Sequence, residues 1–226
     1  IDKKETTVSE LKPSSKEESI SKQEDTYSKQ VTIYRSNGNV VSMDLEEYLI
    51  GVVGAEMPAS FQMEALKAQA VVARTYALKL LASGKKLTDT VSTQVYKDNN
   101  ELKKLWGNSY STYYQKIKEA VISTKGVSVY YQGNYINALY HSTSNGKTED
   151  ASMVWGNSVP YLKSVDSKWD VQASSYLREI KEDFTNVLNL LGISNDTNIQ
   201  FEIISRDESG RVEKIKVGDK IFDGVT

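Results

Sequence analysis

Residues 43–78 read MDLEEYLIGVVGAEMPASFQMEALKAQAVVARTYAL and predict two consecutive helices at the centre of the fold. Asp44 is a suitable N-cap for the first helix, because its carboxylate can accept a hydrogen bond from a free backbone N–H of the first turn. Apolar residues recur at helical spacing up to Pro58, which ends the helix. The second helix begins near Ser60 and stops before Gly84, and it is apolar nearly all round, which indicates burial.

Segments on both sides of this helical pair read as strands. The first of them turns at Asn37-Gly38, a dipeptide that strongly favours a tight hairpin turn. The strand-like segments are 31–43, 127–141, 160–165 and 199–222. Further helices are expected over 112–124 and 175–191, whereas 85–110 is polar and mixed and is expected to form an irregular surface lobe. This order predicts an α+β fold, with mainly antiparallel strands and hairpins around a buried central helix pair.

The N-terminal segment differs in composition from the rest of the chain. Residues 1–29 are rich in Lys, Glu, Ser and Thr and contain few apolar side chains. Such a sequence buries too little apolar surface to offset the entropy that it loses on ordering. We therefore predict a flexible tail or linker over residues 1–29 and one folded domain over residues 30–226.

Composition excludes several kinds of chemistry. The 226 residues include 28 Lys and Arg and 30 Asp and Glu, and the resulting net charge of -2 argues against a nucleic-acid partner. With 0 cysteines and 1 histidine, the chain has no disulfide, no thiolate nucleophile and no site with several histidine ligands. No apolar run approaches the roughly 18 residues that span a bilayer. Catalysis is therefore expected from carboxyl, amine, hydroxyl or amide groups.

Glu56 falls on the apolar side of the first predicted helix. At about 100° per residue it lies about 20° from Leu45 around the helix axis, on the stripe that also carries Tyr48 and Val52. A carboxyl group in such a place loses hydration, which favours its protonated form, and a general acid needs a proton near neutral pH. Because Glu56 belongs to the last turn, the alternative interpretation is a side chain that turns into solvent.

Two cations interrupt the apolar surface of the second predicted helix. Lys67 and Arg74 are seven residues apart and therefore share one face, together with Ala70 and Leu78. Unpaired buried charge is costly, so cations in such a place usually serve a carboxylate or a ligand. If the two helices pack together, these cations approach Glu56; the alternative is that they reach solvent at the helix edge.

A polar loop follows the strand-like segment 127–141. Residues 142–150 read STSNGKTED, and they either offer hydroxyl groups and backbone donors to a polar ligand such as a sugar or form a plain flexible loop. His141 precedes them, and a lone histidine after a strand is more often structural than catalytic. Ser142 and Ser144 lack the G-x-S-x-G sequence of a nucleophile elbow, so neither is expected to attack a substrate.

Three blocks of the sequence resemble the SpoIID family, which is named for stage II sporulation protein D and whose wider SpoIID/LytB group includes amidase enhancers. The blocks are residues 43–78, YHSTSNGKTEDASMVWG at 140–156 and VPYLKSV at 159–165. They occur in the family's order and at comparable spacing, and the resemblance runs from about residue 31 to the end of the chain. It implies that residues 30–226 are a catalytic domain whose C-terminus is shorter than in the family.

The resemblance implies a lytic transglycosylase that acts on peptidoglycan. Such enzymes cleave glycan strands between N-acetylmuramic acid and N-acetylglucosamine without adding water, and they leave a 1,6-anhydro-muramyl end. The catalytic acid of the family falls on Glu56, which the helix geometry singles out independently. The resemblance also places substrate-binding residues at Lys67, Arg74, Ser144, Tyr161 and Lys163.

The sequence departs from the family where some members bind a metal. Those members place cysteines and a further histidine near the loop at 142–150, and these residues bind zinc. This chain has no cysteine and carries Lys147 in that loop, so we expect neither a metal site nor a cofactor.

The same resemblance implies partners and a location. It implies a membrane anchor upstream of Ile1, an extracytoplasmic position between forespore and mother cell, and action during engulfment in endospore formation. The substrate is expected to be glycan strands from which a partner amidase has removed the stem peptides. The rival function is a non-catalytic module that enhances a separate amidase. A third alternative is a hydrolase with a second carboxylate such as Glu149 or Asp166, which would release reducing ends.

Overall fold

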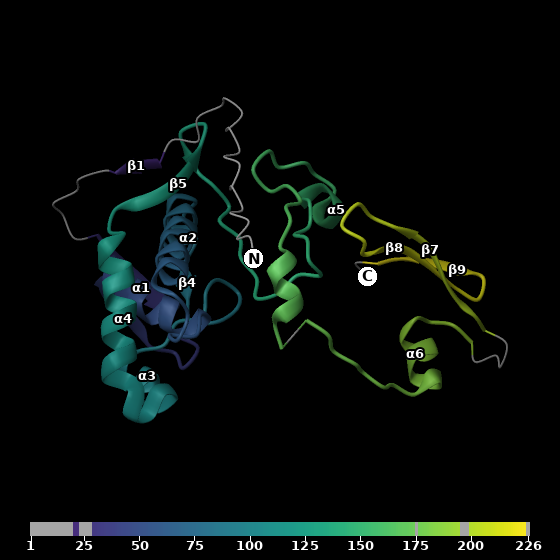
Figure 1. Ribbon diagram of the computed structural model, residues 1–226, viewed down its shortest axis with the longest axis horizontal. Coiled ribbons are helices and arrows are strands. Elements are labelled where there is room, and N and C mark those ends of the chain that lie inside the picture. Colours follow the sequence, from purple (N-terminus) through teal and green to yellow (C-terminus); the bar gives the residue numbers. More distant parts are fainter. Residues whose placement is uncertain (1–19, 23–28, 175, 195–198, 225–226) are drawn as a thin grey trace, which may run out of the picture. The chain divides into compact units, whose positions relative to one another are not determined.

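The structure, a computed structural model, describes residues 20–22, 29–174, 176–194 and 199–224. The chain divides into two compact units, of which the first ends at Tyr140 and the second begins at His141. The first unit combines helices with two small sheets, and the second combines helices with one small sheet (Figure 1). The strands in these sheets are mainly antiparallel. The predicted α+β fold is therefore confirmed.

The first unit contains helices that pack on one another and two small sheets. The helices are α1 (Leu45–Glu56), α2 (Met63–Ala82), α3 (Asn99–Trp106) and α4 (Tyr110–Ser123), with a 3-10 turn, η1 (Gly107–Ser109), before α4. One sheet has the order β3-β2-β4, from β3 (Val40–Asp44), β2 (Gln30–Tyr34) and β4 (Leu87–Thr88). The other has the order β1-β5-β6, from β1 (Ile20–Lys22), β5 (Val127–Tyr131) and β6 (Asn134–Tyr135). Helices α1, α2 and α4 contact one another and enclose the core (Figure 1).

The core of this unit confirms the two predicted central helices. Asp44 caps α1 by accepting a hydrogen bond from the backbone N–H of Glu46 at 2.8 Å, and α1 ends at Glu56, two residues before Pro58. The predicted hairpin also forms, because β2 and β3 pair antiparallel on either side of Gly38, which has a positive φ of 88°. Side chains without solvent exposure fill the space between α1, α2 and α4: Tyr48, Leu49, Val52, Val53, Leu66, Ala70, Ala73, Ala77, Ile117, Ala120 and Val121.

The expectation of an irregular surface lobe over residues 85–110 is wrong. The segment contains β4 and α3, and Gln94 within it is only 1% exposed. It also approaches α1 very closely, because a Cβ added to Gly51 would lie 2.3 Å from the ring of Tyr96 and 2.6 Å from the backbone oxygen of Lys97. Only glycine permits this approach at position 51, so the segment is part of the packed unit.

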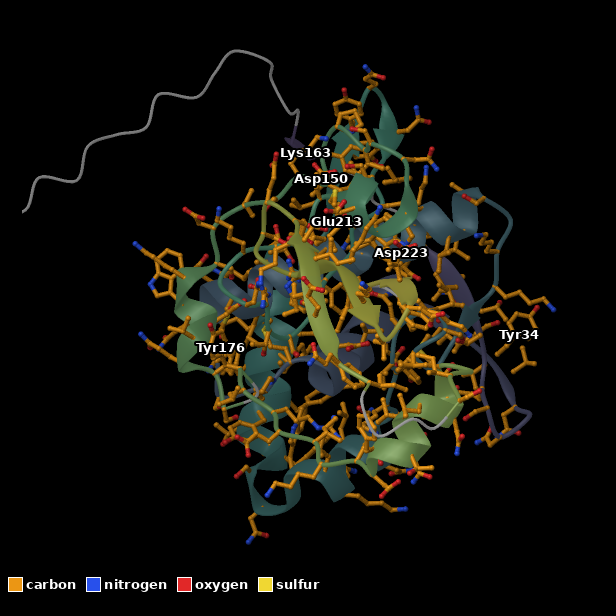
Figure 2. The ribbon with its side chains drawn as sticks, turned by 90° about the vertical axis from the view of Figure 1, so that its right-hand side faces the viewer. Tyr34, Asp150, Lys163, Tyr176, Glu213 and Asp223 are labelled. Atoms are coloured by element: carbon orange, nitrogen blue, oxygen red, sulfur yellow. The ribbon has the colours of Figure 1, made fainter. Side chains whose placement is uncertain are left out.

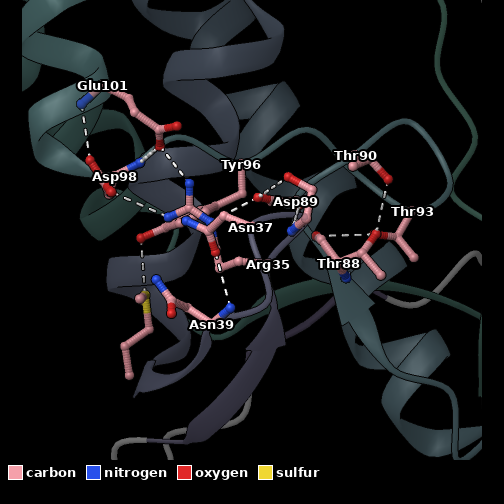
Figure 3. A network of polar contacts seen from close by, with 12 residues as sticks. Arg35, Asn37, Asn39, Thr88, Asp89, Thr90, Thr93, Tyr96, Asp98 and Glu101 are labelled. Atoms are coloured by element: carbon pink, nitrogen blue, oxygen red, sulfur yellow. Dashed lines mark hydrogen bonds and ion pairs between the residues drawn. The ribbon is translucent and has the colours of Figure 1, made fainter.

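Arg35 follows β2 and holds the same segment by three ion pairs. Its guanidinium group contacts the carboxylates of Asp89 at 2.8 Å, Asp98 at 3.2 Å and Glu101 at 2.7 Å (Figure 3). Asp98 and Glu101 also form the capping box at the start of α3. We call these four residues the Arg35 cluster. The cluster fastens both ends of the segment between β4 and α3 to the β2–β3 hairpin.

The second unit has a smaller core. It contains α5 (Ala151–Trp155), a 3-10 helix η2 (Lys168–Gln172), α6 (Phe184–Leu190) and an antiparallel sheet of β7 (Phe201–Arg206), β8 (Val212–Val217) and β9 (Lys220–Asp223) in that order. Leu188, Ile193 and Val217 are its buried apolar side chains. The predicted C-terminal strands are confirmed. The helix expected over 175–191 begins only at Phe184, and residues 160–165 form no strand.

Three residues of the predicted tail belong to a sheet. Ile20–Lys22 pairs antiparallel with β5, so that Ile20 lies opposite Val129. The rest of the predicted tail, residues 1–19 and 23–28, lies outside the part of the chain that the structure describes. Among the described residues, no helix combines the length and the apolar character that are needed to cross a membrane.

Candidate functional site

Glu56 is the last residue of α1, and its side chain is half-buried. The backbone N–H of Val95 donates a hydrogen bond to its Oε1 at 2.7 Å. The helix stops here because Met57 adopts an extended conformation before Pro58. The carboxyl group is therefore held by a backbone donor from another segment, and the alternative of a side chain turned freely into solvent is not observed.

Gln94, the residue before Val95, is almost fully buried. Its Nε2 donates to the backbone oxygen of Ala73 at 3.3 Å and to the hydroxyl of Tyr48 at 3.4 Å. Its Oε1 accepts from the Tyr140 hydroxyl at 3.4 Å. Because a carbonyl oxygen can only accept, the contact with Ala73 fixes which end of the Gln94 amide carries the N–H groups. A chain of polar contacts thus runs from α2 through Gln94 to Tyr140.

Burial around this network raises the pKa of several tyrosines. Desolvation raises the pKa of Tyr96 to about 12. Desolvation is also the largest cause of the raised pKa of Tyr48 and of Tyr140, and the negative charge of Glu56 acts in the same direction on both hydroxyl groups. All three hydroxyl groups therefore stay protonated, and able to donate, throughout the neutral range.

These raised values predict a loss of stability in alkali. A tyrosine with a pKa of about 10 in the unfolded chain and a higher pKa in the folded one keeps its full contribution to the free energy of unfolding below pH 10. That contribution is lost as the pH rises from about 10 toward the pKa of Tyr96, about 12. Urea unfolding at a series of pH values should show this decline together with late tyrosinate absorbance. If all 14 tyrosines ionised near pH 10 without loss of stability, the burial described here would be contradicted.

Arg74 pairs with Glu46 and not with Glu56. Its Nε and Nη2 donate to the two carboxylate oxygens of Glu46 at 2.9 and 2.5 Å, and the Arg74 side chain is 1% exposed. Its other N–H groups reach backbone oxygens of the surrounding elements: Ala70, Val121 and Val127. Because every N–H group of the guanidinium has an acceptor within the protein, the geometry favours a structural role for Arg74 over contact with a substrate.

Lys67 lies on the same helix but is open to solvent. Its Nζ contacts the carboxylate of Glu64 at 2.8 Å, and 31% of its side chain is exposed. An ion pair between exposed residues one turn apart contributes only about 0.2–0.5 kcal/mol, so a ligand can displace it. Lys67 and Arg74 therefore have different partners, although they share a helix face. Of the two, only Lys67 has a side chain that a ligand can reach.

The other predicted substrate-binding residues belong to the second unit. The backbone N–H and the hydroxyl of Ser144 both donate to Oδ2 of Asp170 at 2.7 Å, and Ser144 is buried. Lys163 is 48% exposed, and its Nζ contacts the carboxylate of Asp150 at 3.1 Å (Figure 2). Tyr161 is half-buried. Of these three side chains, Lys163 is the most exposed.

The carboxylates considered for a second catalytic role also lie in the second unit. Glu149 accepts hydrogen bonds from the Ser209 hydroxyl at 2.6 Å and from the Arg211 guanidinium at 2.7 Å. Asp166 is exposed, and its backbone forms an isolated antiparallel β-bridge with that of Lys147. Across residues 20–22, 29–174, 176–194 and 199–224, no three His, Cys, Asp or Glu side chains are arranged to hold a metal ion.

Sequence reasoning missed Val95, which holds Glu56, and also Gln94 and Tyr140. Val95 acts through its backbone N–H, which no side-chain pattern reveals. Gln94 lies in a segment without apolar periodicity. Tyr140 lies near the end of a strand-like segment, where a tyrosine is expected for packing and suggests no polar role. The available signal was the single amide side chain in Thr93–Tyr96, between a hydroxyl residue and two apolar ones.

Comparison with known proteins finds one family. Residues 34–131 match the family model described as SpoIID, stage II sporulation protein. Over 155 residues, 65% of this chain and 45% of the relative, the sequence is 48% identical to stage II sporulation protein D of Bacillus subtilis (strain 168). The protein of the same name from Bacillus amyloliquefaciens is 46% identical over 156 residues. A protein named amidase enhancer from Bacillus subtilis (strain 168) is 42% identical over 114 residues, 50% of this chain and 14% of that protein.

The matched region coincides with much of the first unit. It begins at the last residue of β2 and ends at the last residue of β5, so it includes Glu56, Gln94 and the Arg74–Glu46 ion pair. The matched regions span 45% of the length of the two stage II sporulation proteins. Residues 34–131 of this chain therefore belong to the SpoIID family.

Proposed function

We propose that this chain is a lytic transglycosylase that cleaves peptidoglycan between N-acetylmuramic acid and N-acetylglucosamine and leaves 1,6-anhydro-muramyl ends. The observation that carries the proposal is the half-buried carboxyl group of Glu56, one oxygen of which is held by the Val95 N–H at 2.7 Å. The relatives named as sporulation proteins support a role in endospore formation, where we place the activity at engulfment.

One carboxyl group suffices for this reaction. In its protonated form, Glu56 gives its proton to the glycosidic oxygen while the bond from that oxygen to the anomeric carbon breaks. As a carboxylate, Glu56 then takes the proton of the C6 hydroxyl group, whose oxygen attacks the anomeric carbon and closes the anhydro ring. The Val95 N–H occupies Oε1, so the exchange of the proton falls to the other carboxyl oxygen.

The other carboxylates of α1 are too far from Glu56 to assist it. Ordinary glycosidases use two carboxyl groups separated by about 5–9.5 Å. Glu46 and Glu47 lie about 15 and 14 Å from Glu56 along the helix axis. Glu46 is in addition bound to Arg74. This spacing supports a reaction with a single acid over hydrolysis by two carboxylates of this helix.

We assign substrate binding to the side chains of Lys67, Tyr161, Lys163 and Ser144. The two exposed ammonium groups suit the lactyl carboxylate and the N-acetyl oxygens of the glycan. The tyrosine ring suits stacking on a sugar. The substrate in this proposal is a strand stripped of stem peptides by a partner amidase. The enzyme would act on the extracytoplasmic side of a membrane to which a segment upstream of Ile1 anchors it.

Product analysis tests the proposal. Purified glycan strands, with and without stem peptides, are incubated with the protein and analysed by mass spectrometry. We expect products with anhydro ends, which are about 18 Da lighter than reducing ends because no water is added, and faster release from the stripped strands. Reducing ends would instead indicate a hydrolase with a second carboxylate and would overturn the proposed reaction.

The match to an amidase enhancer supports a second candidate function. That match covers 114 residues and half of this chain, so the same domain occurs in a protein with a different name. A binding module would retain affinity for glycan strands in a pull-down assay while releasing no fragments of either kind. It would also accelerate a purified cell-wall amidase. Anhydro products from the wild-type protein alone would exclude this candidate as the full account.

A further inference from the structure

A cavity of about 300 Å³ lies in the first unit, between α1, β3 and the start of α3. Val41 and Met43 of β3 form its apolar side together with Ile50 of α1. Tyr96 and Tyr114 add aromatic rings to the lining. Ligand pockets in proteins typically measure about 300–1,000 Å³, so a cavity at the lower end of this range suits a ligand the size of a single sugar residue.

The cavity lies on the side of α1 that faces away from Glu56. At about 100° per residue, the lining residues Glu47 and Ile50 point about 180° and 120° away from Glu56 around the helix axis. Glu47 is also about 14 Å from Glu56 along this axis. A group bound in the cavity is therefore not the group on which Glu56 acts, and the two sites are separate.

The polar lining of the cavity suits a neutral ligand with several hydroxyl groups. Its charged residues are two cations, Arg35 and Lys97, and two anions, Glu47 and Asp98, so their charges cancel. Such a lining has little net attraction for a phosphate or an ammonium ion. A carboxylate only accepts hydrogen bonds, an ammonium group only donates them, and an amide such as that of Asn100 does both. Hydroxyl and N-acetyl groups need this mixture of donors and acceptors.

Three of these polar side chains are available to a ligand. Within the described chain, the side chains of Glu47, Lys97 and Asn100 form no hydrogen bond or ion pair with the protein. Glu47 and Asn100 are exposed, and Lys97 is half-buried. A ligand can therefore bond to all three without displacing a contact of the protein or leaving a buried group unsatisfied.

The wall of the cavity that leads into α3 is held in place by the protein itself. Asp98 pairs with Arg35 at 3.2 Å (Figure 3) and accepts a hydrogen bond from the backbone N–H of Asn100 at 2.9 Å. The backbone N–H of Lys97 donates to the backbone oxygen of Gly51 in α1 at 3.4 Å. Because this wall is already ordered, a ligand loses little affinity to the cost of ordering it.

We propose that this cavity is a second saccharide-binding site, which holds a sugar residue of the glycan strand away from the bond that Glu56 cleaves. The identity of the strand rests on the proposed function. Glu47, Lys97 and Asn100 bond to hydroxyl and N-acetyl groups, and the apolar side and the Tyr114 ring contact the C–H groups of the sugar. A strand bound at both sites is held more tightly than at either one, so the cavity increases affinity for long strands and takes no part in the chemical step.

The double variant Glu47→Ala with Asn100→Ala tests this site by kinetics. We expect KM for long stripped strands to rise about 10- to 100-fold, which corresponds to the loss of two hydrogen bonds, and kcat to stay unchanged. A tetrasaccharide cleaved at its central bond extends only two sugar residues to either side, so it does not reach the cavity and its kcat/KM should keep the wild-type value.

Glu119→Ala with Asn108→Ala is the matched control. It removes the same two types of side chain from exposed positions outside the cavity, and KM for long strands should stay at the wild-type value. A KM for long strands that is unchanged in the cavity variant, or raised equally in the control, would overturn the proposal.

A measurement without cleavage separates this site from the proposed function. A dimer of N-acetylglucosamine is titrated into 15N-labelled Glu56→Gln protein, in which the cavity is intact, and the amide resonances of Lys97, Asn99 and Asn100 should shift. Such shifts, together with a wild type that releases no glycan fragments, would overturn only the proposed function. Cleavage by the wild type without these shifts would overturn only the second site. Shifts caused by a lysine-containing stem peptide and not by the sugar would overturn the assignment to a saccharide.

Discussion

Glu56→Gln is expected to abolish strand cleavage while the protein stays folded. A glutamine amide cannot transfer a proton to the glycosidic oxygen, and loss of a general acid typically lowers kcat by about 100- to 10,000-fold. The amide retains an oxygen that can accept from the Val95 N–H, so the local packing at the end of α1 is preserved. The measurements are the rate of release of anhydro products and the thermal midpoint of the same preparation.

Glu119→Gln provides the matched control for this experiment. Glu119 is an exposed residue of α4, and the same change of charge there should leave both the rate and Tm unaltered. Cleavage by Glu56→Gln at the wild-type rate would exclude Glu56 as the acid. A large fall in Tm with Glu56→Gln would show instead that the carboxyl group is needed for folding.

Arg74→Met is expected to cause the largest loss of stability among the residues discussed here. Removing one partner of a buried ion pair typically costs about 3–5 kcal/mol, because the other charge is left buried and unpaired. The change also leaves the backbone oxygens of Val121 and Val127 without the Arg74 donor. Urea unfolding followed by circular dichroism should show a midpoint far below that of the wild type.

The double variant distinguishes a structural role from a binding role. When Glu46→Leu is combined with Arg74→Met, no unpaired charge remains, so the double variant should lose much less stability than the sum of the single variants. By contrast, Lys67→Ala should leave the free energy of unfolding within about 0.5 kcal/mol of the wild type, because its ion pair is exposed. A stable Arg74→Met protein that had lost only its affinity for glycan would contradict the structural role.

The sequence predicts those parts of this molecule that depend on local patterns. Periodicity and capping place α1 and α2, and the Asn37-Gly38 turn places the first hairpin. The same helix arithmetic selects Glu56, because an apolar stripe on one helix is a local property. Helix α6 is shorter than the helix expected over 175–191. It begins only at Phe184, because Asp183 is its N-cap.

Contacts between distant segments are what the patterns leave out. Helix periodicity shows that Arg74 and Lys67 share a helix face. It does not show which carboxylate pairs with Arg74, because Glu46 lies 28 residues earlier in the chain. Val95 reaches Glu56 from a segment with no period of its own, because the Arg35 cluster and the close approach at Gly51 hold this segment in place. Such positions follow from tertiary packing, for which a single sequence carries no direct signal.

The ion pair between Arg74 and Glu46 has a consequence for how relatives of this protein are interpreted. A relative that lost the proposed catalytic acid and survived as a binding module would still have to keep the two charges together or lose them together in order to stay folded. Selection on folding alone would retain Arg74 in active and inactive members alike, and the two positions would have to mutate together. The presence of this arginine is therefore no marker of enzymatic activity, and under the proposed function the position to compare among relatives is Glu56.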